Sequence, residues 1–149
     1  GYSAKQHDGY LGNSVIGEWC NLGANTNTSN LKNDYTNVKL HSYATNQLED
    51  SGQLFAGLFM GDFTRAGIST MFNTGTVVGV GANIFGAGFP RQFIPSFSWG
   101  GAAGFETFRL DKANEVAERV MARRGLPYDA VEQGIMAHVF AETAKDRVV

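Results

Sequence analysis

The sequence predicts a mainly β fold, a solenoid of short parallel strands wound as a triangular prism, followed by two helices. Three observations support this prediction: a six-residue repeat in two blocks, glycines concentrated inside those blocks, and a change to a helical period after residue 110. A period of six fits neither an α-helix nor an amphipathic strand, but it fits a coil in which each unit supplies one face of a prism. Chance recurrence in a Gly-rich β-sandwich is the alternative interpretation.

The repeat occupies residues 7–30 and 54–89, and each unit opens on an apolar residue and has a small residue fifth. We expect the opener to point into the axis, the fifth residue to pack in the corner, and the next turn to stack about 4.8 Å away. Glycines at the second position are expected to allow sharp turns. The openers are Tyr10, Ile16, Leu22, Met60, Ala66, Phe72, Val78 and Ile84; the fifth residues are Ser14, Cys20, Thr26, Thr64, Thr70, Thr76, Ala82 and Gly88; the glycines are Gly17, Gly23, Gly61, Gly67 and Gly79.

Three segments follow from this pattern. Residues 1–89 are predicted to form the β-helix, with a polar loop excursion at residues 31–53 that leaves the coil and returns to it. Long loops in compact domains usually serve a site, although a merely tolerated insertion is the alternative. Residues 90–109 are an extended aromatic, Pro- and Gly-rich segment. Because Pro90 and Pro95 disfavour a helix or a central strand, this segment is expected along the prism side or against a neighbouring subunit.

Residues 110–149 are predicted to form a two-helix appendage that packs as a hairpin over the end or flank of the solenoid. The first helix ends near Gly125, and Asp129 with Glu132 forms a capping box for the second. The apolar stripe of the first comprises Leu110, Ala113, Ala117, Val120 and Met121; that of the second comprises Val131, Ile135, Val139 and Phe140.

Composition excludes several classes of function. The chain has 149 residues and a net charge of -2, so it offers no basic field for nucleic acid or anionic lipid. Its single cysteine, Cys20, argues against a disulfide framework and fits a reducing compartment. No stretch has the length of a membrane span, and no signal peptide pattern is present, so a cytoplasmic location is expected.

Several polar residues around the first block are equipped for acyl transfer to an amine. His7 precedes the first unit, and its imidazole is suited to take the proton that an attacking amine loses. Amide and ammonium groups hold an anionic sugar phosphate. On spacing alone, however, a single histidine in this position is more often a solvated surface residue. The accompanying polar residues are Tyr10, Asn21, Asn30, Lys32 and Lys39.

A specific resemblance covers residues 7 to 89. The run from His7 to Gly17, with Asn21 to Thr26 and the restart at Met60, resembles the acetyltransferase half of the bacterial bifunctional N-acetylglucosamine-1-phosphate uridylyltransferase / glucosamine-1-phosphate acetyltransferase family. It is more similar to archaeal and Bacteroidetes sugar-1-phosphate nucleotidylyltransferases that have the same left-handed β-helix. The resemblance therefore implies a left-handed parallel β-helix.

The resemblance also implies a set of roles. It makes His7 the general base, with Tyr10, Asn21 and Asn30 at the substrate, and it leaves open whether Lys32 or Lys39 contacts the phosphate. Acetyl-CoA is the co-substrate, no metal is implied, and the assembly is a homotrimer with the site between subunits. A nucleotidyltransferase domain would belong to residues N-terminal to this chain. Backbone groups of Ala24, Ile68 and Gly86 would hold the acetyl-CoA.

Three functions compete at this stage. The leading hypothesis is an N-acetyltransferase that moves acetyl from acetyl-CoA to the amine of an amino-sugar 1-phosphate, in sugar nucleotide biosynthesis. The alternative is a non-catalytic trimerising or regulatory module, prompted by Asn25, where the family usually has glycine, and by the lysine that does not align. A carbonic-anhydrase branch of the fold needs three histidines around zinc, and the dispersed His7, His41 and His138 argue against it.

Overall fold

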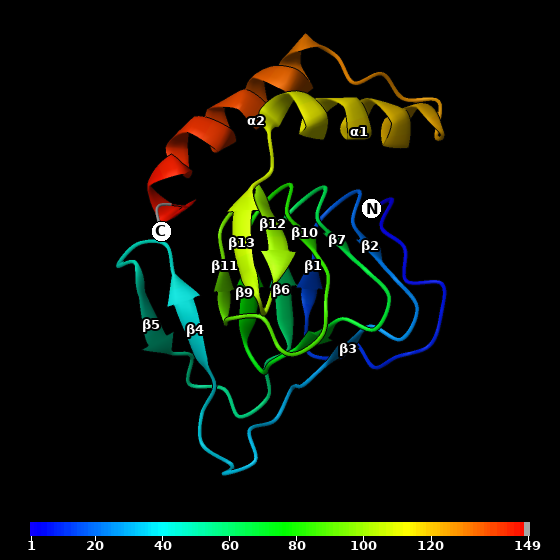
Figure 1. Ribbon diagram of the computed structural model, residues 1–149. Coiled ribbons are helices and arrows are strands. Elements are labelled where there is room, and N and C mark those ends of the chain that lie inside the picture. Colours follow the sequence, from blue (N-terminus) through cyan, green and yellow to red (C-terminus); the bar gives the residue numbers. More distant parts are fainter. Residues whose placement is uncertain (148–149) are drawn as a thin grey trace.

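The computed structural model describes residues 1–147, in which the chain winds repeatedly through three sheets whose strands pair in parallel, apart from an antiparallel last strand (Figure 1). The sheets have the strand orders β1-β6-β9-β11, β2-β7-β10-β12-β13 and β3-β8, and we call this winding the coil. The predicted mainly β fold with parallel sheets and two helices is confirmed. The winding is compatible with a β-helix, and its left-handedness stays a prediction. The strands are β1 (Val15–Ile16), β2 (Asn21–Leu22), β3 (Asn27–Thr28), β6 (Leu58–Met60), β7 (Arg65–Ala66), β8 (Met71–Phe72), β9 (Thr76–Val78), β10 (Asn83–Ile84), β11 (Phe93–Ile94), β12 (Ser98–Gly101) and β13 (Gly104–Thr107).

The unit openers stack on one another inside the coil. Ile16 pairs with Met60, which pairs with Val78, and Leu22 pairs with Ala66 in the neighbouring sheet. Most of these side chains belong to one buried cluster, while the buried threonines at fifth positions donate to nearby carbonyls, such as Thr26 Oγ1 to Gly23 O at 2.7 Å. Two units depart from the expectation. Tyr10, in the first unit, is 53% exposed, and Gly88, at the corner that follows β10, is exposed as well.

The glycines at second positions were predicted to allow sharp turns, but the turns do not occur at these glycines. None of the five is in the left-handed region; instead a Cβ on Gly61 would lie 2.9 Å from the carbonyl carbon of Gly79 on the next turn. The sharp turns fall at the fourth position, where non-glycine residues adopt positive φ, as in Asn25 at 57°. Glycine is therefore required for close approach of neighbouring turns at four of the five positions, whereas the atom nearest to a Cβ on Gly67 would be Phe85 Cβ at 3.4 Å. The other fourth-position residues with positive φ are Asn13, Trp19, Phe63, Ser69, Gly75 and Gly81.

Replacing Gly79 with alanine is expected to destabilise the protein by about 1–3 kcal/mol through overpacking. The added Cβ would lie 2.6 Å from Ser96 Cα, and backbone on the adjoining turn cannot move aside as a flexible side chain does. Urea unfolding followed by circular dichroism measures the effect. The control is Gly134→Ala, because Gly134 lies in the helix α2 (Ala130–Glu142) with open space around its Cα, and alanine favours helix by up to about 1 kcal/mol. Equal stability of the Gly79 variant and the parent would contradict this explanation.

The excursion between β3 and β6 contains an antiparallel hairpin of β4 (Lys39–Ser42) and β5 (Gln47–Asp50). It leaves the coil and returns to the same register, since Ile16 pairs with Met60. His41 attaches it to the last turn: its ring stacks on Phe93 at 3.6 Å and meets Tyr43 edge-on at 5.3 Å. Within residues 1–147, the buried Nε2 of His41 has no hydrogen-bond partner.

The environment of His41 predicts that stability falls on mild acidification. Burial lowers the pKa of His41 from its ordinary 6.5, against the opposing charge of Asp146. The folded protein therefore binds this proton less readily than the unfolded chain, so the full stability is present above about pH 6.5 and declines as the pH falls through the lower folded pKa. Urea unfolding between pH 7.5 and 5.5 measures the decline. In His41→Phe the decline should shrink, whereas the exposed His138→Phe should retain it; an unchanged slope in the His41 variant would refute the assignment.

The segment at residues 90–109 differs from the prediction. Rather than lying along the prism side, it forms the last turn of the coil, where β11 pairs with β9 and β12 pairs with β10. The coil therefore continues beyond residue 89, and β13 returns antiparallel along β12. The prolines permit this because Pro90 precedes β11 and Pro95 follows it, so neither occupies a ladder position.

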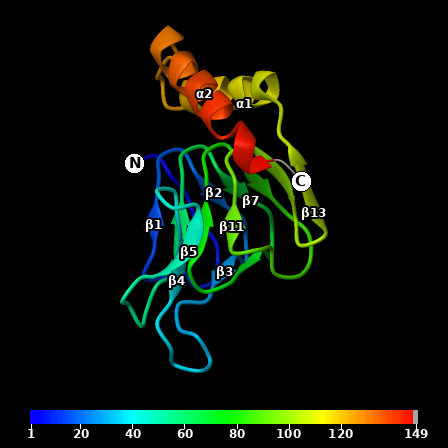
Figure 2. The same cartoon turned by 90° about the vertical axis from the view of Figure 1, so that its left-hand side faces the viewer.

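The two helices, α1 (Leu110–Ala122) and α2 (Ala130–Glu142), lie across one end of the strands, along the corner that joins the β1 and β2 sheets (Figure 2). Corner aromatics such as Trp19 and Phe97 pack against them. The side chain of Asp129 accepts from Glu132 N at 3.0 Å, which confirms the predicted cap of α2. A short 3-10 helix follows at Ala144–Arg147. Among the described residues, none of the helices has the length and apolar character needed to cross a bilayer.

The buried face of α1 is as predicted, but that of α2 is not. Ala113, Ala117 and Met121 of α1 are buried. In α2, Val131 and Ile135 are exposed, at 69% and 54%, although they were expected on the buried face. The helix instead turns Met136 inward, with Val139 and Phe140 partly buried beside it. The reason is that α2 is apolar almost all round, so its periodicity does not select one face.

Candidate functional site

His7 lies at a corner of the coil, on an edge segment that runs beside β2. Ala4 bridges Asn21 of β2, and Asn25 N donates to Asp8 O at 3.1 Å. Ala4 and Asp8 thus pair with Asn21 and Asn25 on the next turn. Because His7 lies between Ala4 and Asp8 in the sequence, it occupies the position equivalent to Ala24. Its side chain is exposed, and no hydrogen bond within residues 1–147 engages its ring. The imidazole is therefore free to meet a substrate.

The three residues predicted to hold acetyl-CoA lie in line with His7. Ala24, Ile68 and Gly86 each follow the paired residues of β2, β7 and β10 by two positions. Ser69 N donates to Ala24 O at 2.8 Å and joins the first two turns. Across the described part of the chain, the N–H groups of Ala24, Ile68 and Gly86 have no hydrogen-bond acceptor. We call this line of His7, Ala24, Ile68 and Gly86 the His7 edge. It offers one imidazole beside three available backbone donors.

Tyr10 and Asn30 are brought together, as the resemblance implies. Asn30 Nδ2 donates to the Tyr10 hydroxyl at 2.9 Å and to Asn13 Oδ1 at 2.7 Å. Tyr10 N in turn donates to Asn27 Oδ1 at 2.8 Å. These bonds fix the Tyr10 side chain at the surface, although no hydrogen bond among the described residues joins it to His7. The cluster is thus a preorganised polar patch one corner away from the His7 edge.

Lys32 and Lys39 line one cavity of about 310 Å³ between the excursion and the coil. Gln92 Nε2 ties its walls together by donating to Lys39 O and to Thr74 O, both at 3.0 Å. Within residues 1–147, no acidic residue lines this cavity, although Asp34 is close enough to Lys32 for their charges to interact. Asn30 lies between two of the lining residues, so the Tyr10 patch borders this cavity. Both lysines therefore border one cavity. The lining residues are Ser29, Leu31, Lys32, Asn33, Lys39, Leu48, Asn73, Thr74 and Gln92.

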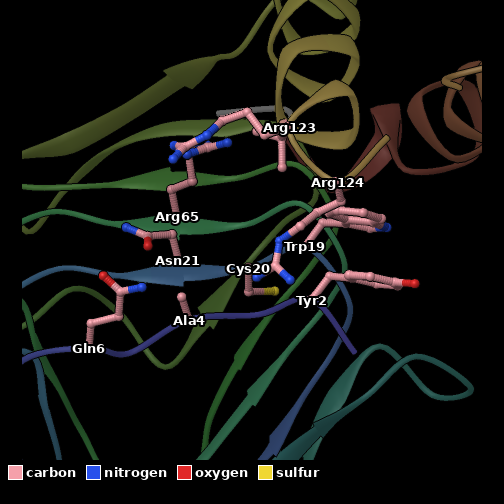
Figure 3. A pocket seen from close by; sticks show the side chains of 10 residues that line it. Tyr2, Ala4, Gln6, Trp19, Cys20, Asn21, Arg65, Arg123 and Arg124 are labelled. Atoms are coloured by element: carbon pink, nitrogen blue, oxygen red, sulfur yellow. The ribbon is translucent and has the colours of Figure 1, made fainter. Parts of the chain in front are cut away.

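Asn21 lies apart from the other predicted residues. It is exposed on β2 and lines a different cavity, next to Arg65 of β7 (Figure 3). Arg65, together with Arg123 and Arg124 of the α1 end, was missed by the sequence reasoning. A signal was available, because Arg65 occupies the outward sixth position of its unit, as Asn21 does. Among the described residues, Arg65 is the single cation in that column, between Asn21 and Asn83. Arg123 and Arg124 come from a distant part of the sequence, so the repeat pattern does not indicate that the three arginines meet.

Two other chemistries fit the site less well. Burial raises the pKa of the Cys20 thiol, and its Sγ donates to Gly61 O at 3.1 Å, so it is a poor nucleophile. Within residues 1–147, no three His, Cys, Asp or Glu side chains gather closely enough to hold a metal ion. The arrangement is instead suited to proton transfer by an exposed imidazole beside backbone donors.

Comparison with known proteins places this geometry in context. No family profile matches the chain. It is 41% identical over 73 residues to the bifunctional protein GlmU of Methanocaldococcus jannaschii, a match that covers 49% of this chain and 17% of that protein. It is 35% identical over 79 residues to a bifunctional sugar-1-phosphate nucleotidylyltransferase/acetyltransferase of Sulfurisphaera tokodaii, covering 53% of this chain and 19% of the relative. The resemblance found in the sequence is thereby confirmed: about half of this chain is related to archaeal bifunctional enzymes of this kind, and the match spans less than a fifth of their length.

Proposed function

We propose that the chain is an N-acetyltransferase, which transfers acetyl from acetyl-CoA to the amine of an amino-sugar 1-phosphate. The observation that supports this most is the His7 edge, where an imidazole lies in line with the N–H groups of Ala24, Ile68 and Gly86, all without a hydrogen-bond partner within residues 1–147. The relatives support the reaction class, because both are named bifunctional and one is named an acetyltransferase. The co-substrate and the amino sugar are parts of the proposal.

The reaction needs only a base and hydrogen-bond donors. The lone pair of the amine attacks the thioester carbonyl carbon, the nitrogen loses a proton to the imidazole of His7, and the carbon–sulfur bond breaks. The thiolate leaves with the bonding pair and is protonated to free coenzyme A. Backbone N–H groups of the His7 edge hold the acetyl-CoA, and such donors also stabilise an oxyanion. The acyl group passes directly between substrates, since the buried Cys20 is unsuited to carry it.

The sugar phosphate is assigned to the region around Tyr10. The Tyr10 and Asn30 pair would contact the sugar, and the cavity of Lys32 and Lys39 would take the phosphate, since within residues 1–147 two lysines and no acidic residue line it. Asn21 lies on another sheet, so it would reach the same substrate only across a subunit boundary. This separation supports a homotrimer in which sites form between subunits.

An apolar groove supports the same assembly. It has a volume of about 480 Å³ and runs over the outer face of β1, β6 and β9, where Val15 is 63% exposed beside Phe59 and Val77. A further copy of the chain would bury this face. The relatives' length supports a nucleotidyltransferase domain alongside this part, and the buried, unpaired Cys20 fits the reducing cytoplasm.

Asn25, one of the two features that prompted the non-catalytic alternative, is compatible with an intact site. Asn25 stands where the family usually has glycine, but its φ of 57° lies in the left-handed region that asparagine tolerates better than other side chains. Its Nδ2 also donates to Ser69 Oγ at 3.1 Å, which joins two turns. The substitution therefore keeps the local backbone of the His7 edge.

The proposal is tested by a thiol-release assay with acetyl-CoA and a panel of amino-sugar 1-phosphates. Coenzyme A release with at least one amine, and none with glucose 1-phosphate, is the expected result. Glucose 1-phosphate is the matched control because it has a hydroxyl in place of the amine of glucosamine 1-phosphate. A correctly folded protein that releases no thiol with any amine would leave the non-catalytic module as the function.

A further inference from the structure

A second cavity lies between the outer face of β2 and β7 and the end of α1 (Figure 3). Its volume is about 280 Å³, and three arginines, Arg65, Arg123 and Arg124, line it together with the amides of Gln6 and Asn21. Among the described residues, none that lines this cavity is acidic. In a chain of net charge -2, three of the 12 basic side chains thus gather at one cavity without a counter-charge. The remaining lining residues are Tyr2, Ala4, Trp19, Cys20 and Val120.

Arg65 is the unusual member of this cluster. It lies on β7, in register between Asn21 and Asn83, so its neighbours in the sheet are neutral amides. Its side chain is partly buried, and within residues 1–147 it makes no side-chain hydrogen bond or ion pair. Burial lowers the pKa of Arg65, and no nearby carboxylate opposes this. A guanidinium that has lost part of its water without gaining a partner is costly unless an anion supplies one.

Arg123 and Arg124 approach the same cavity from the helix. Basic residues at the end of a helix are explained in part by the helix dipole. That explanation does not extend to Arg65, which belongs to the sheet. Arg124 is also held in place, since its guanidinium carbon lies 5.8 Å from the Tyr2 ring and Tyr2 stacks on Trp19 at 4.2 Å. The three cations therefore face one space from two different elements.

We propose that this cavity binds a phosphate monoester, with its phosphate held by Arg65, Arg123 and Arg124. A phosphate group carries nearly two negative charges and several acceptor oxygens, and guanidinium groups bind such oxygens in pairs. The cavity has room for a phosphate with a small organic group, whose hydroxyls would meet Gln6 and Asn21. This inference does not rest on the proposed acetyl transfer. The ester is either the amino-sugar 1-phosphate, in which case the three arginines replace Lys32 and Lys39 as its phosphate ligands, or another phosphate such as a nucleotide.

Isothermal titration calorimetry of the chain at low salt tests the proposal. The probes are inorganic phosphate, glucosamine 1-phosphate and adenosine 5′-monophosphate, with succinate as a dianion that lacks a phosphate. We expect at least one phosphate ester to bind more tightly than succinate. Arg65→Gln and the pair Arg123→Gln with Arg124→Gln should each weaken binding by about tenfold or more, because each removes charged hydrogen bonds. The preferred ester then shows which of the two sources the cavity serves.

The matched control is Arg119→Gln, because Arg119 is an exposed arginine on α1 that does not line the cavity. It should leave affinity within about twofold while changing the net charge by the same amount. If Arg65→Gln does not fold, the double variant Arg123→Gln with Arg124→Gln, which changes two exposed residues at the end of α1, still tests whether the cavity binds phosphate. Absence of binding at millimolar phosphate ester, succinate binding as tightly as the esters, or equal losses in the Arg119 variant would overturn the proposal. None of these measurements depends on acetyl transfer.

Discussion

Replacing His7 with alanine is expected to lower the rate of acetyl transfer by about 10²–10⁴-fold, the usual contribution of a general base. The amine attacks as a neutral group and must lose a proton as the new bond forms. His7 is the imidazole on the His7 edge, it is exposed, and no intramolecular bond in residues 1–147 competes for its ring. Without it, the proton passes to water. The measurement is coenzyme A release at saturating acetyl-CoA, compared between the variant and the parent.

The control for this prediction is His138→Ala, which removes an exposed imidazole from α2, far along the chain from the His7 edge. It should retain full activity. Sedimentation and acetyl-CoA affinity of the His7 variant should match the parent, because the backbone donors of Ala24, Ile68 and Gly86 are unchanged. Parental activity in His7→Ala would remove His7 from the mechanism. Loss of assembly together with activity would assign it a structural role instead.

Replacing Phe72 with alanine is expected to destabilise the fold by about 3–5 kcal/mol. Phe72 is fully buried at the coil axis, and it lies on β8, which within residues 1–147 pairs with β3 alone. Few neighbouring strands are therefore available to collapse into the space that the ring leaves. Urea unfolding monitored by circular dichroism gives the change in the free energy of unfolding.

Phe89→Ala is the matched control, since the Phe89 side chain is 51% exposed. Its effect should stay within about 0.5 kcal/mol, as for surface substitutions in general. A Phe72 variant that loses less than about 1 kcal/mol would mean that the openers do not form the main core of the coil.

Much of the candidate site was predictable because it follows the backbone register. Ala24, Ile68 and Gly86 lie in line because each occupies the same position in its turn, and the repeat determines that position. Tyr10 and Asn30 were expected at one substrate and are hydrogen bonded. Asn21 was assigned to that substrate too, but its outward position on β2 directs it to a different cavity.

By itself, the sequence determined the parallel strands, their six-residue spacing and the apolar openers. An apolar side chain that recurs at one position of every turn can be buried only if the turns stack and the openers share one core. The tertiary structure alone decided the role of the second-position glycines, the last turn at residues 90–109 and the face of α2. These depend on how closely neighbouring turns approach and on what α2 packs against, neither of which a local pattern records. The same holds for Arg65, Arg123 and Arg124, which are distant in sequence and meet only because α1 folds back across the corner of the coil.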